Sequence, residues 1–263
     1  MIAARQIAFG KAAGKKEEPP AYWGLCFTAE EAGSTVAMKT MVMTGAPLPA
    51  VTLETSYDGE IWEPFYVGET TITLPNVGDK VYFRAGEGGN VRFAYAPSIF
   101  SGISRNTFVL TGLIAASGSI QSLLNGVEET YTVDTCAFAF LFSQCASLTS
   151  APRLPALKTA RQCYKSMFQN CDSLTAIPEL VALPFSQACY HQMCSSCDNL
   201  KRVKVLWHSF PSQNNSSDGG SYNWLKGVSP TGTFICPTAL GTNETIKRGV
   251  SYCPEGWTVI NED

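Results

Sequence analysis

Residues 163–180 read Cys-Tyr-Lys-Ser-Met-Phe-Gln-Asn-Cys-Asp-Ser-Leu-Thr-Ala-Ile-Pro-Glu-Leu, and parts of this stretch recur around it at a period of 26 residues. The recurring positions are Cys145, Cys171 and Cys197, then Leu148, Leu174 and Leu200, and the pairs Cys163-Tyr164 and Cys189-Tyr190. A repeat of this length predicts stacked units, because one unit alone cannot bury its own apolar side chains.

Each unit is expected to hold two local structures. Cys-Tyr-x-x-Met-Phe predicts a helical turn, and Ser-Leu-Thr-x-x-Pro predicts an extended stretch. The period lies within the roughly 20–29 residues of leucine-rich repeats. Since fewer than three full units are present, both ends need caps, and Ile120–Leu124 and residues 207–263 are the candidates.

The sequence before the repeat predicts short strands. Residues 51–57 alternate apolar and polar side chains and end at Asp58-Gly59, which is a strong hairpin signal. Thr70–Leu74 is rich in β-branched residues, and Lys80–Arg84 alternates again. Strands at this spacing, separated by turn residues, are typical of a small β-sandwich.

Residues 136–206 resemble the BspA-type leucine-rich repeats, whose unit is similar to Cys163–Leu180 at nearly every position. Flanking segments resemble regions that accompany these repeats: Leu25–Glu30, Thr111–Gly118, Thr231–Pro237 and Pro254–Val259. Proteins of this kind occur in gut bacteria and their phages, and the resemblance implies surface attachment or a place in a virion. The expected fold class is mixed, with an N-terminal β-sandwich-like domain followed by a short leucine-rich-repeat solenoid and a C-terminal cap.

These patterns divide the chain into five expected parts. They are an anchor segment (1–21), a β-sandwich-like domain (22–104), a connector and N-terminal cap (105–130), the repeats (131–206) and a C-terminal cap (207–263).

Three roles compete for the ten cysteines. The period favours buried apolar packing, because free cysteine behaves as a small hydrophobe. Disulfides are an alternative, with Cys236–Cys253 the best candidate because neither belongs to the repeat. A metal site built from Cys189, His191, Cys194 and Cys197 is the third, since Cys-x-x-Cys spacing suits zinc. We favour packing and expect no metal and no cofactor.

Composition narrows the function classes. The net charge is −3 and only 16% of residues are charged, which disfavours a basic nucleic-acid surface. With two histidines and no carboxylate pair in a catalytic context, we expect no enzyme activity and no catalytic residues. No apolar run reaches the roughly 18–20 residues of a membrane span. Residues 1–20 lack the apolar stretch of an export signal, so we expect the chain to stay in the bacterial cytoplasm or assemble there.

The favoured hypothesis is a phage virion component, such as a head or tail fibre or a capsid decoration protein. Ile2, Ile7 and Phe9 are predicted to anchor it to capsid or tail proteins, as a homodimer or homotrimer. Tyr222, Asn223 and Trp224 are the candidate surface residues for a host-surface protein or a glycan. The alternative is a bacterial cell-surface adhesin, which requires an export route.

Overall fold

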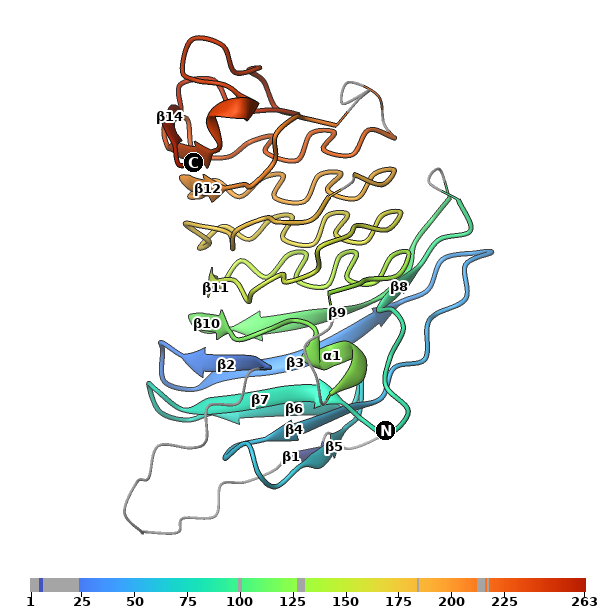
Figure 1. Cartoon of the computed structure of the whole chain (residues 1–263). Helices are drawn as coiled ribbons and strands as arrows, with labels where there is room; N and C mark the ends of the chain where they lie inside the picture. Colours follow the sequence, from blue (N-terminus) through green and yellow to red (C-terminus); the bar gives the residue numbers. More distant parts are fainter. Residues whose placement is uncertain are drawn as a thin grey trace.

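The structure is a computed structural model, and it describes residues 5–6, 24–98, 101–126, 131–183, 185–211, 216 and 218–263. In these residues the chain is nearly all β, with three sheets. The described helices are α1 (Ser122–Asn125) and the 3₁₀ turn η1 (Thr238–Leu240). The chain runs from the strands at one end of the molecule, through stacked coils, to the C-terminal sheet at the other end (Figure 1).

Two sheets make up the N-terminal end. The first has the order β1-β6-β3-β9-β8. Its strands are β1 (Arg5–Gln6), β6 (Thr70–Leu74), β3 (Ser34–Met41), β9 (Ser104–Thr111) and β8 (Ala94–Tyr95). The second has the order β11-β10-β2-β7-β4-β5. Its strands are β11 (Leu148–Ser150), β10 (Ile114–Ser117), β2 (Leu25–Ala29), β7 (Lys80–Ala85), β4 (Leu53–Ser56) and β5 (Glu63–Phe65).

The predicted strands and hairpin of this region are confirmed. The strand expected over Thr70–Leu74 is β6, and Lys80–Arg84 falls within β7. The turn at Asp58 joins the antiparallel pair β4 and β5. The Asp58 side chain accepts backbone N–H bonds from Glu60 and Ile61 at 2.8 and 2.9 Å, which fixes the turn.

Aromatic side chains hold the two sheets face to face. Phe108 of β9 meets Phe27 of β2 at 5.1 Å and Phe83 of β7 at 5.4 Å between ring centroids, both edge to face. All three rings are buried. Edge-to-face pairs of buried rings add roughly 0.5–1.5 kcal/mol each beyond the area they bury.

Both sheets continue directly into the repeat. β11, which belongs to the first repeat, pairs in parallel with β10. On the other layer, the backbone N–H of Phe108 in β9 donates to the carbonyl oxygen of Leu141 at 2.8 Å. Residues 104–117, expected mostly within a connector, thus supply β9 and β10, the strands onto which the repeat stacks. The turn from β9 into β10 needs a glycine at position 112. Gly112 has a φ of 68°, and a Cβ at this position would collide with Ser34.

The third sheet lies at the C-terminal end and has the parallel order β12-β13-β14. Its strands are β12 (Arg202–Lys204), β13 (Thr233–Cys236) and β14 (Thr258–Asn261). Lys204 binds Glu179 of the preceding coil and Glu262 after β14, each at 2.9 Å. This network is exposed, so its contribution to stability is small.

The predicted mixed fold class is wrong. A leucine-rich-repeat solenoid with a helical turn in every unit is not present, because the described part of residues 131–206 contains no helix. The segments expected to be helical turns are instead chains of tight turns. Their N–H groups alternate between a carbonyl three residues back and a carbonyl of the next coil, so no helical run of bonds develops.

Candidate functional site: a polar face along the stacked coils

The stacked coils share one backbone hydrogen-bond ladder. Phe138 donates its N–H to the carbonyl of Cys163, and Tyr164 donates to Cys189 one repeat further on. Tyr190 continues the ladder to Gly220 in the C-terminal part, at 2.7 Å. The donors and acceptors of adjacent coils therefore lie in register from the first coil to the last.

Every fourth residue of a coil has a positive φ. These residues are Cys136, Phe140 and Gln144 in the first coil, Gln162, Ser166 and Asn170 in the second, and Ala188, Gln192 and Ser196 in the third. A left-handed residue reverses the local direction of the chain. Placed every fourth residue, these reversals produce the zigzag path of each coil in Figure 1.

The zigzag of the second coil sends one side chain in four toward the surface. In the second coil, Arg161, Lys165 and Gln169 are half-buried, while residues 162–164 and 166–168 between them are buried. We give the name polar face to these three positions and to the positions that the ladder aligns with them in the next two coils. They are Arg161, Lys165 and Gln169, then Gln187, His191 and Ser195, then Asp218, Tyr222 and Lys226, and of these His191 and Ser195 are buried. The ladder aligns them in three rows, because the carbonyls of these nine residues accept its outer bonds.

His191 lies low in this face and is only 9% exposed. Burial, with the charge of Lys165 second, lowers its pKa from 6.5 to about 4. The imidazole is therefore neutral at pH 7. Its ring and the ring of Tyr222 pack edge to face with centroids 5.3 Å apart, so the imidazole packs rather than titrates in the physiological range.

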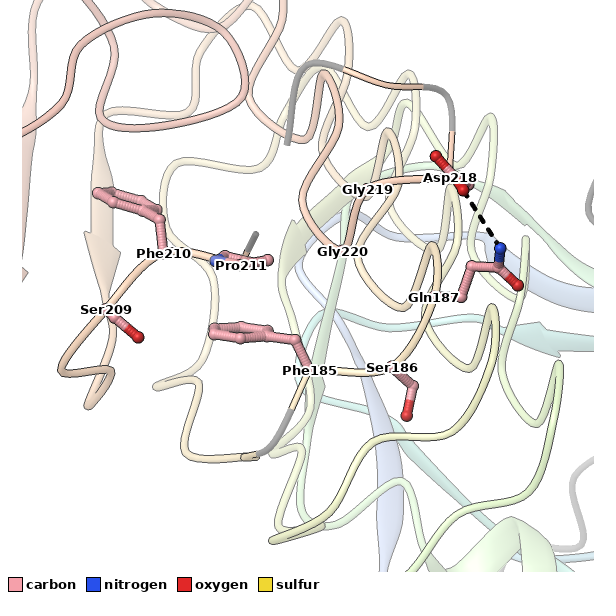
Figure 2. A pocket seen from close by; sticks show the side chains of 9 residues that line it. All are labelled: Phe185, Ser186, Gln187, Ser209, Phe210, Pro211, Asp218, Gly219 and Gly220. Atoms are coloured by element: carbon pink, nitrogen blue, oxygen red, sulfur yellow. Dashed lines mark hydrogen bonds between the residues drawn. The ribbon is translucent and has the colours of Figure 1, made fainter. Parts of the chain in front are cut away.

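A cleft of about 570 Å³ opens at the C-terminal end of the polar face (Figure 2). Its walls are two aromatic rings, Phe185 and Phe210, and the polar side chains of Gln187 and Asp218. Gln187 donates to the Asp218 carboxylate at 3.4 Å, so the two side chains are held together across the cleft edge.

Asp218 is ionised at neutral pH. Hydrogen bonds from Ser216, and then from Gln187, lower the pKa of its carboxyl below the ordinary 3.8. The core holds the Phe185 side chain in place, because its ring packs edge to face on Trp207 with the ring centroids 4.8 Å apart. An apolar ring beside an amide and a carboxylate can stack on the flat side of a sugar and hydrogen-bond its hydroxyls.

The predicted binding residues are divided by the structure. Tyr222 and Asn223 are half-buried on or beside the polar face. Trp224 is 0% exposed, so the prediction that it binds a ligand at the surface is wrong. Its ring contacts Trp207 at 5.1 Å and its Nε1 donates to the Tyr252 carbonyl at 3.0 Å, which makes it part of the core. The predicted anchors Ile2, Ile7 and Phe9 lie outside the described residues.

Sequence reasoning missed Gln187, Asp218, Phe185 and Phe210. Gln187 was recoverable, because it lies one period after Arg161. Asp218 was not recoverable. Its carbonyl accepts the ladder bond from Ala188, but the two residues are further apart in the sequence than the repeat period predicts. The aromatic walls come from irregular segments that carry no periodic signal.

The prediction that the repeat cysteines are buried is confirmed, and all ten thiols are free and buried. Cys145, Cys171 and Cys197 each donate the S–H to a carbonyl of the preceding coil or strand, those of Phe108, Phe142 and Phe168, at 3.2, 3.1 and 2.9 Å. Cys236 and Cys253 are not linked, so the disulfide alternative is wrong for this pair.

The predicted metal alternative, Cys189 with His191, Cys194 and Cys197, is not assembled. Within the described residues, no three His, Cys, Asp or Glu side chains are grouped to hold a metal ion. The same part of the chain contains no helix with the length and apolar character needed to cross a membrane.

No family model, curated protein or solved structure matches this chain. The resemblance to BspA-type repeats therefore stays a prediction from the sequence.

Proposed function

We propose that the protein is a non-enzymatic attachment protein that binds a surface ligand through the polar face and its end cleft. The observation that carries this proposal is the arrangement along the molecule. The strands of the first two sheets lie at one end, and the cleft lies beside the last coil near the other (Figures 1 and 2).

A continuous core supports this role, because it keeps the binding end fixed relative to the strand end. One cluster of buried side chains includes Phe27 in β2, Phe168 in the second coil and Val259 in β14. A rigid scaffold holds a binding surface in place at a lower entropy cost than a flexible one. We further propose that the end of the molecule formed by the first two sheets attaches to a phage virion. The resemblance to BspA-type repeats and the sequence of residues 1–20 favour this.

Binding is tested with the full chain on cells of the bacterium from which the protein or its phage comes. Gln187→Ala combined with Asp218→Asn should weaken cell binding by roughly tenfold or more, since the cleft edge loses the amide of Gln187 and the charged acceptor of Asp218. Asp198→Asn, an exposed carboxylate outside the face, is the matched control and should bind like the wild type. Full binding by the double variant would refute the cleft as the contact.

Virion attachment is tested separately by deleting residues 1–20. Loss of copurification with phage particles, with cell binding of the isolated protein retained, is the expected result. Unchanged incorporation into particles would show that this segment is not the anchor.

A further inference from the structure

The strand end of the polar face carries cations that no acid of the described residues neutralises. They are Arg92, Arg105, Arg161 and Lys165, which we call the cationic cluster. The described ion pairs involve other residues: Arg84 with Glu54, and Lys204 with Glu179 and Glu262. On a chain of net charge −3, these four cations give this part of the surface a local excess of positive charge.

Arg105, Arg161 and Lys165 belong to segments that meet where β8 and β9 contact the first two coils, and Arg92 lies two residues before β8. Arg105 lies opposite Ala94 in the β8–β9 pair, and its guanidinium lies over the Phe140 ring, 4.3 Å from its centroid. Arg161 reaches across to the same strand pair and donates to the carbonyl of Ala96 at 3.0 Å. Lys165 is adjacent to Phe140, because the Phe140 N–H donates to its carbonyl at 2.9 Å.

The charges also act on one common group. Arg161, Arg92 and Lys165 each oppose the rise that burial causes in the pKa of Cys136. Burial in turn lowers the pKa of both Arg105 and Lys165, so these cations are already partly stripped of water. A partly desolvated cation gains more from an anion than a fully hydrated one does, because less hydration remains to be lost.

We propose that the cationic cluster binds the acidic groups of a polysaccharide, and that it forms the charged part of the same ligand site as the polar face. This inference rests on the proposed attachment function and names its ligand class. Arg161 connects the two regions, because it belongs to the cluster and lies one coil before Gln187 in the same row. A chain of sugars lying along the face would reach the cations with its acidic groups and the cleft with its hydroxyls.

A nucleic acid fits this surface less well. Tight duplex binding uses roughly 6–10 phosphate contacts, whereas the cluster has four cations. An acidic polysaccharide also uses the amide and aromatic groups that make up the rest of the site.

The test measures Kd of the full chain for oligogalacturonate, neutral dextran and a single-stranded DNA oligonucleotide of equal charge. We expect binding to oligogalacturonate that weakens as salt rises, and much weaker binding to the other two. Arg161→Gln with Lys165→Gln should raise the Kd for oligogalacturonate at least roughly tenfold, whereas Lys165→Arg should leave it unchanged.

Lys201→Gln with Arg202→Gln removes the same charge from exposed positions outside the polar face and is the matched control. Arg92→Gln with Lys165→Gln is a second test pair if the first lowers the urea midpoint. Equal loss in the control pair, equal affinity for DNA, or no binding to oligogalacturonate would each overturn this inference. The cell-binding variants at Gln187 and Asp218 test the attachment function independently, so the two proposals can fail separately.

Discussion

At the residue scale, cysteine suits the repeat core because its thiol is both apolar enough to pack and able to donate one hydrogen bond. The side chains of Cys171 and Cys197 are fully buried, and each S–H reaches a carbonyl of the preceding coil. A valine would fill similar space without the bond, and a serine would fill less of it. The recurrence of cysteine is therefore explained by the structure without redox or metal chemistry at these positions.

Burial of the thiols predicts how stability depends on pH. Desolvation raises the pKa of Cys145 and of Cys189 from 9.0 to about 12. A group whose pKa is higher in the folded state adds stability below its unfolded value, and that stability is lost as pH rises. We expect a constant urea midpoint from about pH 7 to 8 and a steady fall as pH rises from about 9 toward 12.

Cys145→Ala provides the control for this measurement. The variant should be less stable at pH 7, because it leaves a cavity, yet its midpoint should fall less steeply above pH 9. A wild-type midpoint that stays flat up to pH 11 would contradict the assignment of raised thiol pKa values.

At the element scale, the zigzag coil depends on residues that hold left-handed backbone conformations without being glycine. Local sequence gave no sign of this. Cys136, Gln162 and Ala188 occupy equivalent left-handed positions but share no side-chain type, and glycine is absent from all three. By contrast, β6 was predictable, because its β-branched residues favour a strand wherever they are placed. The conformation of the coils was not predictable from local sequence, since half of their backbone N–H groups donate to a different coil.

Gln144 offers a test of the zigzag backbone, because it is exposed and has a φ of 69°. Gln144→Val should lower the free energy of unfolding by about 1–2 kcal/mol relative to Gln144→Gly, since a left-handed conformation strains a β-branched residue. Urea denaturation measures the difference.

Gln169, which is half-buried and outside the left-handed set, is the matched position. There the order should reverse, with glycine the less stable variant, because glycine loses more backbone freedom on folding. The same order at both positions would mean that the left-handed conformation is not what limits Gln144.

The candidate site was partly predictable at this scale. The period places Gln187 one repeat after Arg161, and Tyr222 was expected near the surface, where it lies. The role predicted for Trp224 failed because tryptophan at a cap can be either core or binding residue, and sequence alone does not distinguish them. Here the aromatic stack of Tyr190, Trp207 and Trp224 decides, with successive centroids 5.3 and 5.1 Å apart.

At the scale of the whole molecule, the last coil depends on residues 207–263. Tyr190 stacks on Trp207, and the N–H groups of Ala188, Gln192 and Ser196 donate to carbonyls at 218, 222 and 226. A chain ending at Leu206 would expose the ring of Tyr190 and leave these three backbone N–H groups unpaired. We expect it to aggregate or lose cooperative unfolding, as followed by size-exclusion chromatography and circular dichroism.

Deleting residues 163–188, one whole period, is the control for this truncation. It keeps both ends and joins equivalent positions of adjacent coils, so the product should stay monodisperse and unfold cooperatively. If the truncated chain were as well folded as the deletion variant, the C-terminal part would not be a cap.

The register of the backbone ladder lets the number of coils change without disturbing the bonds between coils. Duplicating or losing one 26-residue unit leaves every inter-coil bond type in place. It would move the cleft relative to the strands by about 4.8 Å, the usual spacing of hydrogen-bonded neighbours in a sheet. Unequal recombination between units would thus change the distance between the strands and the cleft in steps of one coil, while the two ends of the protein stay the same.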